Sequence, residues 1–412
     1  MKNRTGYLVL FAAVFSLTVG TLLSGCGGSG AQKPDDTAQT ETEQEESGGE
    51  ASAEETSGKE GLDASNLGKA AMKIALVTTS GNTAMCDYDA AADDGAELFI
   101  KDNKDSTLTL VTEETGDAAA CVEKAREAAA DHSVVICSGP LFSGIGSIAA
   151  DYPDVRFILA GAFPTDGSGE EVECENVYAL KFKVEEAGFL AGAAAALETE
   201  TGKVAALGQS ADTYTMDHVF GFVSGVNYAN KHLGTAAEVV SLPDYAYENE
   251  SGANEGGNFS GGEGGEEADA TAAAALYGDG VDIIFAASPA SAAGIVKAAA
   301  ETETGKVIAS DSDKYDAGAA GERNVVLTSV LCRLDRVVMK RLVDVSMESF
   351  EGKNELIGAD TNATGYVFKE GRHQLKPETV TALDELAGKL SSGEIVPAST
   401  VSGTGSDSFT GL

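Results

Sequence analysis

The sequence has few basic residues. It holds 28 lysines and arginines against 66 aspartates and glutamates, so its formal net charge is −38. Such an excess of negative charge repels phosphate backbones and anionic lipid headgroups. We therefore expect no nucleic acid partner and no attraction to an anionic membrane surface.

Histidine and cysteine are also scarce, and the signatures of common enzymes are missing. None of the four histidines is paired at metal-ligand spacing, and no CxxC or Cys/His spacing is typical of a zinc site. The sequence contains no GxxxxGK[ST], HExxH or GxSxG motif. We therefore expect neither catalytic residues nor a cofactor or a metal site. Five cysteines follow Cys26, an odd number that cannot pair fully.

The N-terminus has the pattern of an export signal that ends at a cysteine. Two basic residues among the first five precede an almost wholly apolar run at residues 7–23, and two small residues separate this run from Cys26. This order predicts secretion, and the run is shorter than the roughly 20 residues of a spanning helix. The Leu-Ser-Gly-Cys ending resembles the bacterial lipobox. That resemblance implies cleavage after residues 1–25 and acylation of Cys26, for example with palmitate, on the outer face of the cell membrane; an uncleaved anchor is the alternative.

Residues 26–71 are rich in Glu, Asp, Ser, Thr and Gly and contain no aromatic residue. A segment with so little to bury cannot offset the entropy of ordering its chain, and its like charges extend it. We expect a disordered acidic tether between the anchor and a folded body.

From residue 72 onward, short β-branched runs alternate with alanine-rich stretches. The expected strands are 73–81, 106–112, 133–139, 155–161, 203–209, 237–242, 281–288 and 306–312. The expected helices are 89–101, 117–131, 184–200, 215–234, 266–277 and 290–302. Nearly continuous apolar strands between helices predict an α/β fold with parallel sheets covered on both faces.

The length of this part, about 340 residues, exceeds what a single core usually reaches. We therefore predict two Rossmann-like lobes. The first comprises residues 72–178 and 314–350, and the second comprises 179–313 and 351–402.

Ligands of open α/β sheets bind beyond the carboxyl ends of the strands. The corresponding loops are 78–88, 138–143, 208–218, 286–290 and 309–315. Their hydroxyls, carboxylates and few aromatic rings suit a neutral, hydroxyl-rich, flat ligand and would repel phosphates and carboxylates. The candidate ligand-binding residues are Thr79, Asn82, Tyr88, Asp89, Phe142, His218, Asp311 and Asp313.

Six sequence blocks follow one another in an order found in one known family. They are FKVEEAGFLAGAAAAL (182–197), TGKVAALG (201–208), GFVSGVNYAN (221–230), VDIIFAAS (281–288), VIASDSDK (307–314) and VLTSVLCRLD (326–335). In these blocks the chain resembles the basic membrane protein family of bacterial lipoproteins. The resemblance implies a type I periplasmic-binding-protein fold whose two lobes close on a ligand. It also implies an ABC permease as partner and a ligand that, in some members, is a purine nucleoside.

The first loop departs from the family's pattern of VTD followed by D-x-SFNQ. Thr79 stands where the family usually has its first aspartate. Tyr88 stands at the position of the base-stacking phenylalanine, which keeps an aromatic face. Asp89 replaces an asparagine and so loses an amide donor.

The second lobe departs from the family at two positions. His218 stands where an aromatic residue is usual, and Cys332 stands where a lysine is usual. Asp311, from the DSD run of the family, is retained, and the resemblance implies that it holds sugar hydroxyls.

Other interpretations of the candidates remain open. Tyr88 could cap a helix, His218 could face solvent, Phe142 could be core, and Asp311 and Asp313 could cap the segment that follows. The functional alternatives are a binding protein for a sugar, a receptor that presents its ligand to a membrane sensor, and an exported enzyme that uses His218 and Cys332.

Overall fold

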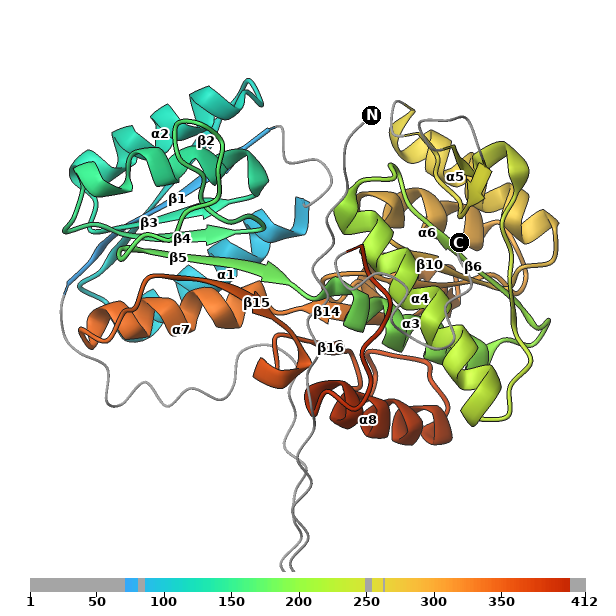
Figure 1. The fold of residues 1–412 in the computed structure, drawn as a ribbon. Helices are drawn as coiled ribbons and strands as arrows, with labels where there is room; N and C mark the ends of the chain where they lie inside the picture. Colours follow the sequence, from blue (N-terminus) through green and yellow to red (C-terminus); the bar gives the residue numbers. More distant parts are fainter. Residues whose placement is uncertain (1–70, 81–85, 249–253, 262–263, 401–412) are drawn as a thin grey trace, which may run out of the picture. The chain divides into compact units, whose positions relative to one another are not determined.

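The described part of the chain forms two six-stranded sheets, each covered by helices on both faces (Figure 1). The computed structural model describes residues 71–80, 86–248, 254–261 and 264–400. The expected signal peptide, Cys26, the acidic tether and Asn82 lie outside the described residues. Among the helices described, none combines the length and the apolar composition needed to cross a bilayer.

The first sheet has the strand order β15-β5-β4-β3-β1-β2, and every neighbouring pair in it is parallel. Its strands are β1 (Lys73–Thr79), β2 (Thr107–Glu113), β3 (Val134–Ser138), β4 (Arg156–Ala160), β5 (Val177–Phe182) and β15 (Lys353–Ile357). Because the central strands are apolar on both sides, each face needs cover. Helix α2 (Ala118–Asp131) covers one face, and α1 (Cys86–Asp102) and α7 (Leu334–Ser346) cover the other (Figure 1).

The second sheet has the order β16-β14-β11-β10-β6-β7 and is parallel except for its β14–β16 pair. Its strands are β6 (Lys203–Leu207), β7 (Glu238–Val239), β10 (Ile283–Ala286), β11 (Lys306–Ala309), β14 (Val326–Cys332) and β16 (Thr364–Tyr366). Its helices are α3 (Val184–Glu198), α4 (Thr213–His232) and α8 (Pro377–Ser391) on one face, with α5 (Gly265–Gly278) and α6 (Ala292–Ala300) on the other.

Short elements complete the described residues. They are the strands β8 (Tyr247–Glu248), β9 (Asn254–Gly256), β12 (Ala319–Ala320) and β13 (Arg323–Asn324), and the 3₁₀ helices η2 (Pro140–Ser147), η3 (Ala149–Asp151), η4 (Pro243–Tyr245), η5 (Pro289–Ser291), η6 (Tyr315–Gly318) and η7 (Ala359–Thr361). The predicted fold class, two parallel α/β lobes, is therefore confirmed. All described residues belong to one unit by their contacts.

The lobe boundaries of the structure differ from the predicted ones. The chain leaves the first sheet after β5, so the predicted boundary at 178/179 falls inside a strand. Strand β14, predicted in the first lobe, belongs to the second sheet, and β15, predicted in the second lobe, belongs to the first sheet. A short strand carries no local mark of the sheet it joins, because its partner strands lie far away in the sequence. The chain thus passes between the lobes three times, after β5, β14 and β15.

The three crossing segments are bonded to one another. The Lys183 N–H donates to the carbonyl oxygen of Ile357 at 2.8 Å, and the Arg333 N–H donates to that of Ala363 at 2.8 Å. Buried Glu186 accepts hydrogen bonds from the Ala359 N–H at 2.6 Å and from the Thr364 hydroxyl at 2.9 Å. These bonds hold the crossings together as one connection between the lobes.

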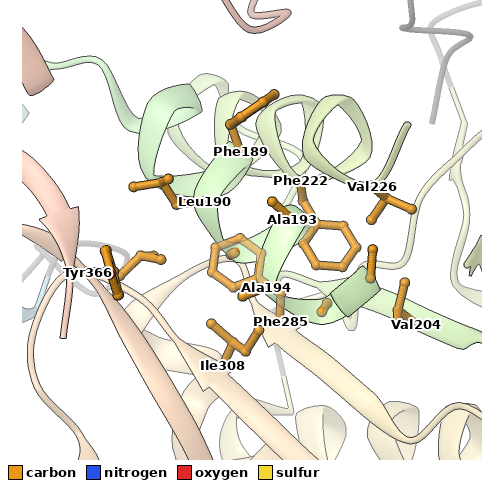
Figure 2. Packing of buried hydrophobic residues seen from close by; sticks show 14 of the residues in the cluster. Phe189, Leu190, Ala193, Ala194, Val204, Phe222, Val226, Phe285, Ile308 and Tyr366 are labelled. Atoms are coloured by element: carbon orange, nitrogen blue, oxygen red, sulfur yellow. The ribbon is translucent and has the colours of Figure 1, made fainter. Parts of the chain in front are cut away.

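Helices α3 and α4 pack at very close range through glycines on both helices. A Cβ atom added at Gly192 would overlap the carbonyl oxygen of Phe222, and one added at Gly225 would overlap that of Phe189. Figure 2 shows the phenylalanine rings around this contact. The rings of Phe222 and Phe285 are stacked with centroids 5.5 Å apart. The close crossing fixes α4, the helix that carries His218, against the core of the second lobe.

Candidate functional site at the strand ends

The site is built around Asp311, two residues beyond the end of β11. Asp311 has a left-handed backbone conformation, with φ of 67°. Aspartate tolerates this region better than most residues because its short polar side chain can bond locally. The Cys332 N–H donates to the Asp311 carbonyl oxygen at 3.0 Å, which ties the loop after β11 to the last residue of β14.

Three buried side chains converge here. Asp311 Oδ2 accepts a hydrogen bond from the Tyr214 hydroxyl, and Asp311 Oδ1 lies 3.6 Å from His218 Nε2. One ligand-type atom each of His218, Asp311 and Cys332 lies within 4.8 Å of the other two. His218 is 0 % exposed, and Asp311 and Cys332 are each 4 % exposed. The cluster therefore joins α4, the loop after β11 and the end of β14 in a space that excludes bulk water.

Burial sets the protonation of this cluster. It raises the pKa of Asp311 to about 7, against the lowering effect of the hydrogen bond from Tyr214. Burial lowers the pKa of His218 to about 4, so the imidazole is neutral at neutral pH. Burial and the negative charge of Asp311 raise the pKa of the Cys332 thiol well above its usual value.

The first lobe reaches this cluster through α1. Tyr88 is 2 % exposed, and its ring meets the edges of Phe182 and Tyr214 at centroid distances of 5.8 and 6.2 Å. Its neighbour Asp87 accepts hydrogen bonds from Lys314 Nζ at 2.8 Å and from the Ser312 hydroxyl at 2.7 Å. Residues of both lobes therefore meet beside Asp311.

A pocket of about 600 Å³ opens next to the cluster, and Asp311 and Cys332 form part of its wall. Its other lining groups include five basic residues, Lys314, Arg333, Arg336, Lys369 and Arg372. Its acidic lining residues are Asp87, Asp94, Asp311, Asp313 and Asp335, also five. The formal charges of the five acidic and five basic lining residues cancel. The pocket therefore differs from the acidic, anion-repelling pocket that the sequence predicted. Lys314 lies in the predicted loop 309–315. Arg333 and Arg336 lie at the start of α7, and Lys369 and Arg372 follow β16; the sequence alone did not assign these last two segments to the site.

The structure brings some predicted residues together and places others elsewhere. His218 and Asp311 meet, and Tyr88 contacts Tyr214, which bonds to Asp311. His218 is a buried residue rather than a solvent-facing one. Asp313 lines the same pocket, where Arg372 Nε donates to it at 2.8 Å.

The remaining candidates lie away from this cluster or have other partners. Thr79, at the end of β1, donates its hydroxyl hydrogen to Glu113 at 2.9 Å. Phe142 is 0 % exposed and packs with Ile145 in the core beside α2, which matches the alternative interpretation of this residue. Asp89 is half-buried on α1.

Tyr214 and Lys314 make central contacts but were not among the predicted ligand-binding residues, although both lie in the predicted loops. Tyr214 lies four residues before His218, so one helix face presents both side chains, and this spacing was a usable signal. Lys314 directly follows the DSD run, but its partner Asp87 is on the other lobe. That pairing depends on how the lobes meet.

Comparison with known proteins gives a family match over part of the chain. Residues 75–251 match the family model described as Bmp, ABC transporter substrate-binding protein PnrA-like. Basic membrane protein D of Borreliella burgdorferi is 25% identical over 211 residues, which cover 50% of this chain and 54% of that protein. A CD4+ T-cell-stimulating antigen of Listeria monocytogenes is 26% identical over 233 residues, which cover 54% and 59% of the two chains. The chain thus spans little more than half the length of these curated relatives.

Solved structures agree with the fold. An ABC transporter solute-binding protein from Aeropyrum pernix matches with a TM-score of 0.61 at 17% identity, over 79% of this chain and 92% of that one. A solute-binding protein from Conexibacter woesei matches with a TM-score of 0.60 at 19% identity, over 79% and 98%. A transcriptional activator of the comK gene from Bacillus halodurans gives 0.58 at 17% identity, over 79% and 99%. At these identities the likeness shows a periplasmic-binding-protein-like fold alone.

Proposed function

We propose that the chain captures a small solute between its lobes for an ABC permease. The basis is its family: through residues 75–251 it belongs to the PnrA-like ABC transporter substrate-binding proteins, the basic membrane proteins. The observation that carries the proposal is the meeting of Tyr88 from one lobe with Tyr214 and Asp311 from the other, beside a pocket of about 600 Å³. This place, beyond the carboxyl ends of parallel strands, is where α/β sheets bind ligands.

The capture step is hinge closure. Three crossings connect the lobes, and a change in their backbone angles would move one lobe relative to the other. Opening would separate Tyr88 from Tyr214 and expose both rings to a solute. Closure would then enclose the solute against Asp311.

The solute class that suits these groups is small and hydroxyl-rich with a flat ring, as in a purine nucleoside or a related compound. The carboxyl of Asp311 can accept hydrogen bonds from sugar hydroxyls, and Tyr88 and Tyr214 supply aromatic surface for a ring. The equal numbers of acidic and basic residues in the pocket suit a ligand without net charge.

The proposal is tested by a thermal-shift screen with nucleosides, free bases and sugars, followed by calorimetric titration of each hit. A solute that binds only the folded chain raises its melting temperature. Asp311→Ala should weaken binding of the hit by about tenfold or more, since hydrogen bonds to charged groups contribute about 1.5–3 kcal/mol. Asp154→Ala, at an exposed turn, is the control. The solute assignment fails if no compound of these classes binds, or if Asp311→Ala binds as tightly as wild type.

The location is part of the same proposal. The N-terminal sequence supports acylation of Cys26 and display on the outer face of the membrane. Expression of the Cys26→Ser chain in a bacterial host tests this point. We expect wild type to sediment with membranes and to incorporate labelled palmitate, and the variant to do neither. Equal labelling of both chains would exclude Cys26 as the attachment site.

A further inference from the structure

Two buried polar atoms face each other without a hydrogen-bond partner among the described residues. They are Nε2 of His218 and Oδ1 of Asp311, which lie 3.6 Å apart. Buried polar atoms in folded proteins are nearly always paired, so an unpaired couple calls for an explanation. The third group of the cluster, Cys332, supplies a thiol within 4.8 Å of both.

The separation of His218 and Asp311 fits a tetrahedral metal centre. Zinc binds histidine nitrogen and carboxylate oxygen at about 2.0–2.2 Å and cysteine sulfur at about 2.3 Å. Two such nitrogen or oxygen ligands at a tetrahedral angle are then about 3.3–3.5 Å apart. The 3.6 Å between His218 Nε2 and Asp311 Oδ1 is close to this value, so this pair needs only a small contraction, and the Cys332 sulfur lies within 4.8 Å of both.

Tyr214 orients two of the three ligands. The Nδ1–H of His218 donates to the Tyr214 carbonyl oxygen at 3.3 Å, which leaves the lone pair of Nε2 directed toward Asp311. The Tyr214 hydroxyl donates to Oδ2 of Asp311, which leaves Oδ1 for another partner. Metal sites are built in this way, with the second nitrogen of the histidine and the second oxygen of the carboxylate held by the protein.

Charge and ligand softness point to a zinc-like ion. A neutral imidazole, a carboxylate and a thiolate carry two negative charges, which neutralise a divalent cation in a buried space. Nitrogen and sulfur ligands select such an ion over Mg²⁺ and Ca²⁺, which prefer oxygen.

We propose that His218, Asp311 and Cys332 form a binding site for one divalent zinc-class ion at the inner wall of the inter-lobe pocket. Asp311 and Cys332 line that pocket, so the fourth coordination position faces it and can take water or a solute atom. The residues come from α4, the loop after β11 and β14, which is why no sequence spacing indicates the site. The inference goes beyond solute capture and does not depend on it.

The test is metal binding to the full chain, reduced and freed of metal with EDTA. Equilibrium dialysis with Zn²⁺ should give one tight site per chain. Titration with Co²⁺ should give a thiolate-to-cobalt absorption band, because a coordinating thiol loses its proton to solvent. Zn²⁺ should also raise the melting temperature of wild type, a readout that needs no variant.

Variants assign the site to these residues. Cys332→Ser should abolish the cobalt band, and His218→Gln and Asp311→Asn should each weaken Zn²⁺ binding at least tenfold. The controls are Cys174→Ser, which changes a half-buried free thiol elsewhere, and His132→Gln, which changes a histidine at the end of α2. Circular dichroism checks that each variant folds.

The proposal is overturned by a cobalt band that survives in Cys332→Ser, or by Zn²⁺ binding to wild type only at the low affinity of its acidic surface. In the latter case the cluster is a His–Asp pair that shares a proton. Repeating the solute screen in EDTA separates this test from that of the proposed function. A solute that binds without metal supports transport even if the metal site fails, and a tight metal site stands even if no solute binds.

Discussion

Asp87 and Lys314 form an ion pair that joins the two lobes. Lys314 Nζ lies 2.8 Å from Oδ1 of Asp87, and the Ser312 hydroxyl donates to Oδ2 of the same carboxylate. Asp87 belongs to the first turn of α1, and Lys314 belongs to the loop after β11. The Lys314 side chain is 28 % exposed and that of Asp87 is 13 % exposed, so solvent screens the pair less than a surface ion pair. The pair is therefore placed to stabilise the arrangement in which the two lobes meet.

Removal of the Lys314 charge should weaken solute binding. Lys314→Met keeps the aliphatic length but loses a charged hydrogen bond, which stabilises closure by about 1–2 kcal/mol, or about 5–30-fold in affinity. Calorimetric titration of a solute from the screen measures this loss. Lys297→Met is the matched control, because Lys297 pairs with Glu267 at 2.7 Å within the second lobe. An equal loss in both variants would mean that the Asp87–Lys314 pair does not favour closure.

Loss of the Tyr214 hydroxyl should destabilise the second lobe. Tyr214→Phe removes the donor to Oδ2 of buried Asp311, and an unsatisfied buried group of this kind costs about 1–3 kcal/mol. Urea unfolding should show a lower midpoint with an unchanged slope. Tyr245→Phe, in the 3₁₀ segment η4, should change the midpoint little. An unchanged midpoint for Tyr214→Phe would show that this hydrogen bond contributes no net stability.

The sequence predicted most of the longer strands and helices before residue 313, because they are encoded locally. It named neither β5 nor the later elements β14, β15, β16, α7 and α8. Apolar runs such as Val134–Ser138 and Arg156–Ala160 became buried parallel strands, as their lack of alternation indicates. Asp311 and His218 were among the predicted ligand-binding residues, and in the structure Asp311 Oδ1 lies 3.6 Å from His218 Nε2. His218 follows from the resemblance to the family, and Asp311 follows also from its place at a strand end.

The features that the sequence did not predict depend on contacts between segments far apart in the chain. The sheet membership of β14 and β15 follows from three crossings of the chain, which no local pattern records. For the same reason Arg372 was not recognised as the partner of Asp313. Phe142 was an ambiguous candidate, because an aromatic residue after a strand serves a core as well as a site.

Acid should remove the contribution of the ionised Glu113 carboxylate to the stability of the fold. The Thr115 hydroxyl is the main cause that lowers the pKa of this buried carboxyl from 4.5 to about 2, and the Thr79 hydroxyl adds to it. A depressed pKa means that the ionised form stabilises the fold. This contribution is complete above about pH 4.5 and is lost as the pH falls toward 2.

The comparison of wild type with Glu113→Gln tests this pH dependence. Wild type should melt at a higher temperature at pH 7, and the difference should shrink between pH 4.5 and pH 2. Glu114→Gln, at the exposed neighbouring position, is the control and should follow wild type. A difference that stays constant with pH would show that the bonds to Glu113 do not depend on its charge.

The two glycines of the family-like block EEAGFLAG allow α3 to pack closely against the backbone of α4. Gly188 and Gly192 lie one turn apart on α3, and a Cβ atom at Gly192 would overlap the backbone of Phe222 on α4. Backbone atoms cannot shift as the end of a flexible side chain can. An added Cβ would therefore force the two helices apart. Gly192→Ala should therefore destabilise the chain by about 1–3 kcal/mol through overpacking, even though alanine favours a helix.

Gly388→Ala is the matched control for this prediction. Gly388 lies in α8, is exposed, and has no atom within 4 Å of an added Cβ. The same substitution should there stabilise the chain by about 0.5–1 kcal/mol, because alanine loses less backbone entropy than glycine on folding. Urea unfolding of both variants should thus give changes of opposite sign. Stabilisation by both would mean that α3 and α4 can separate at no cost, and that the glycines do not set the position of His218.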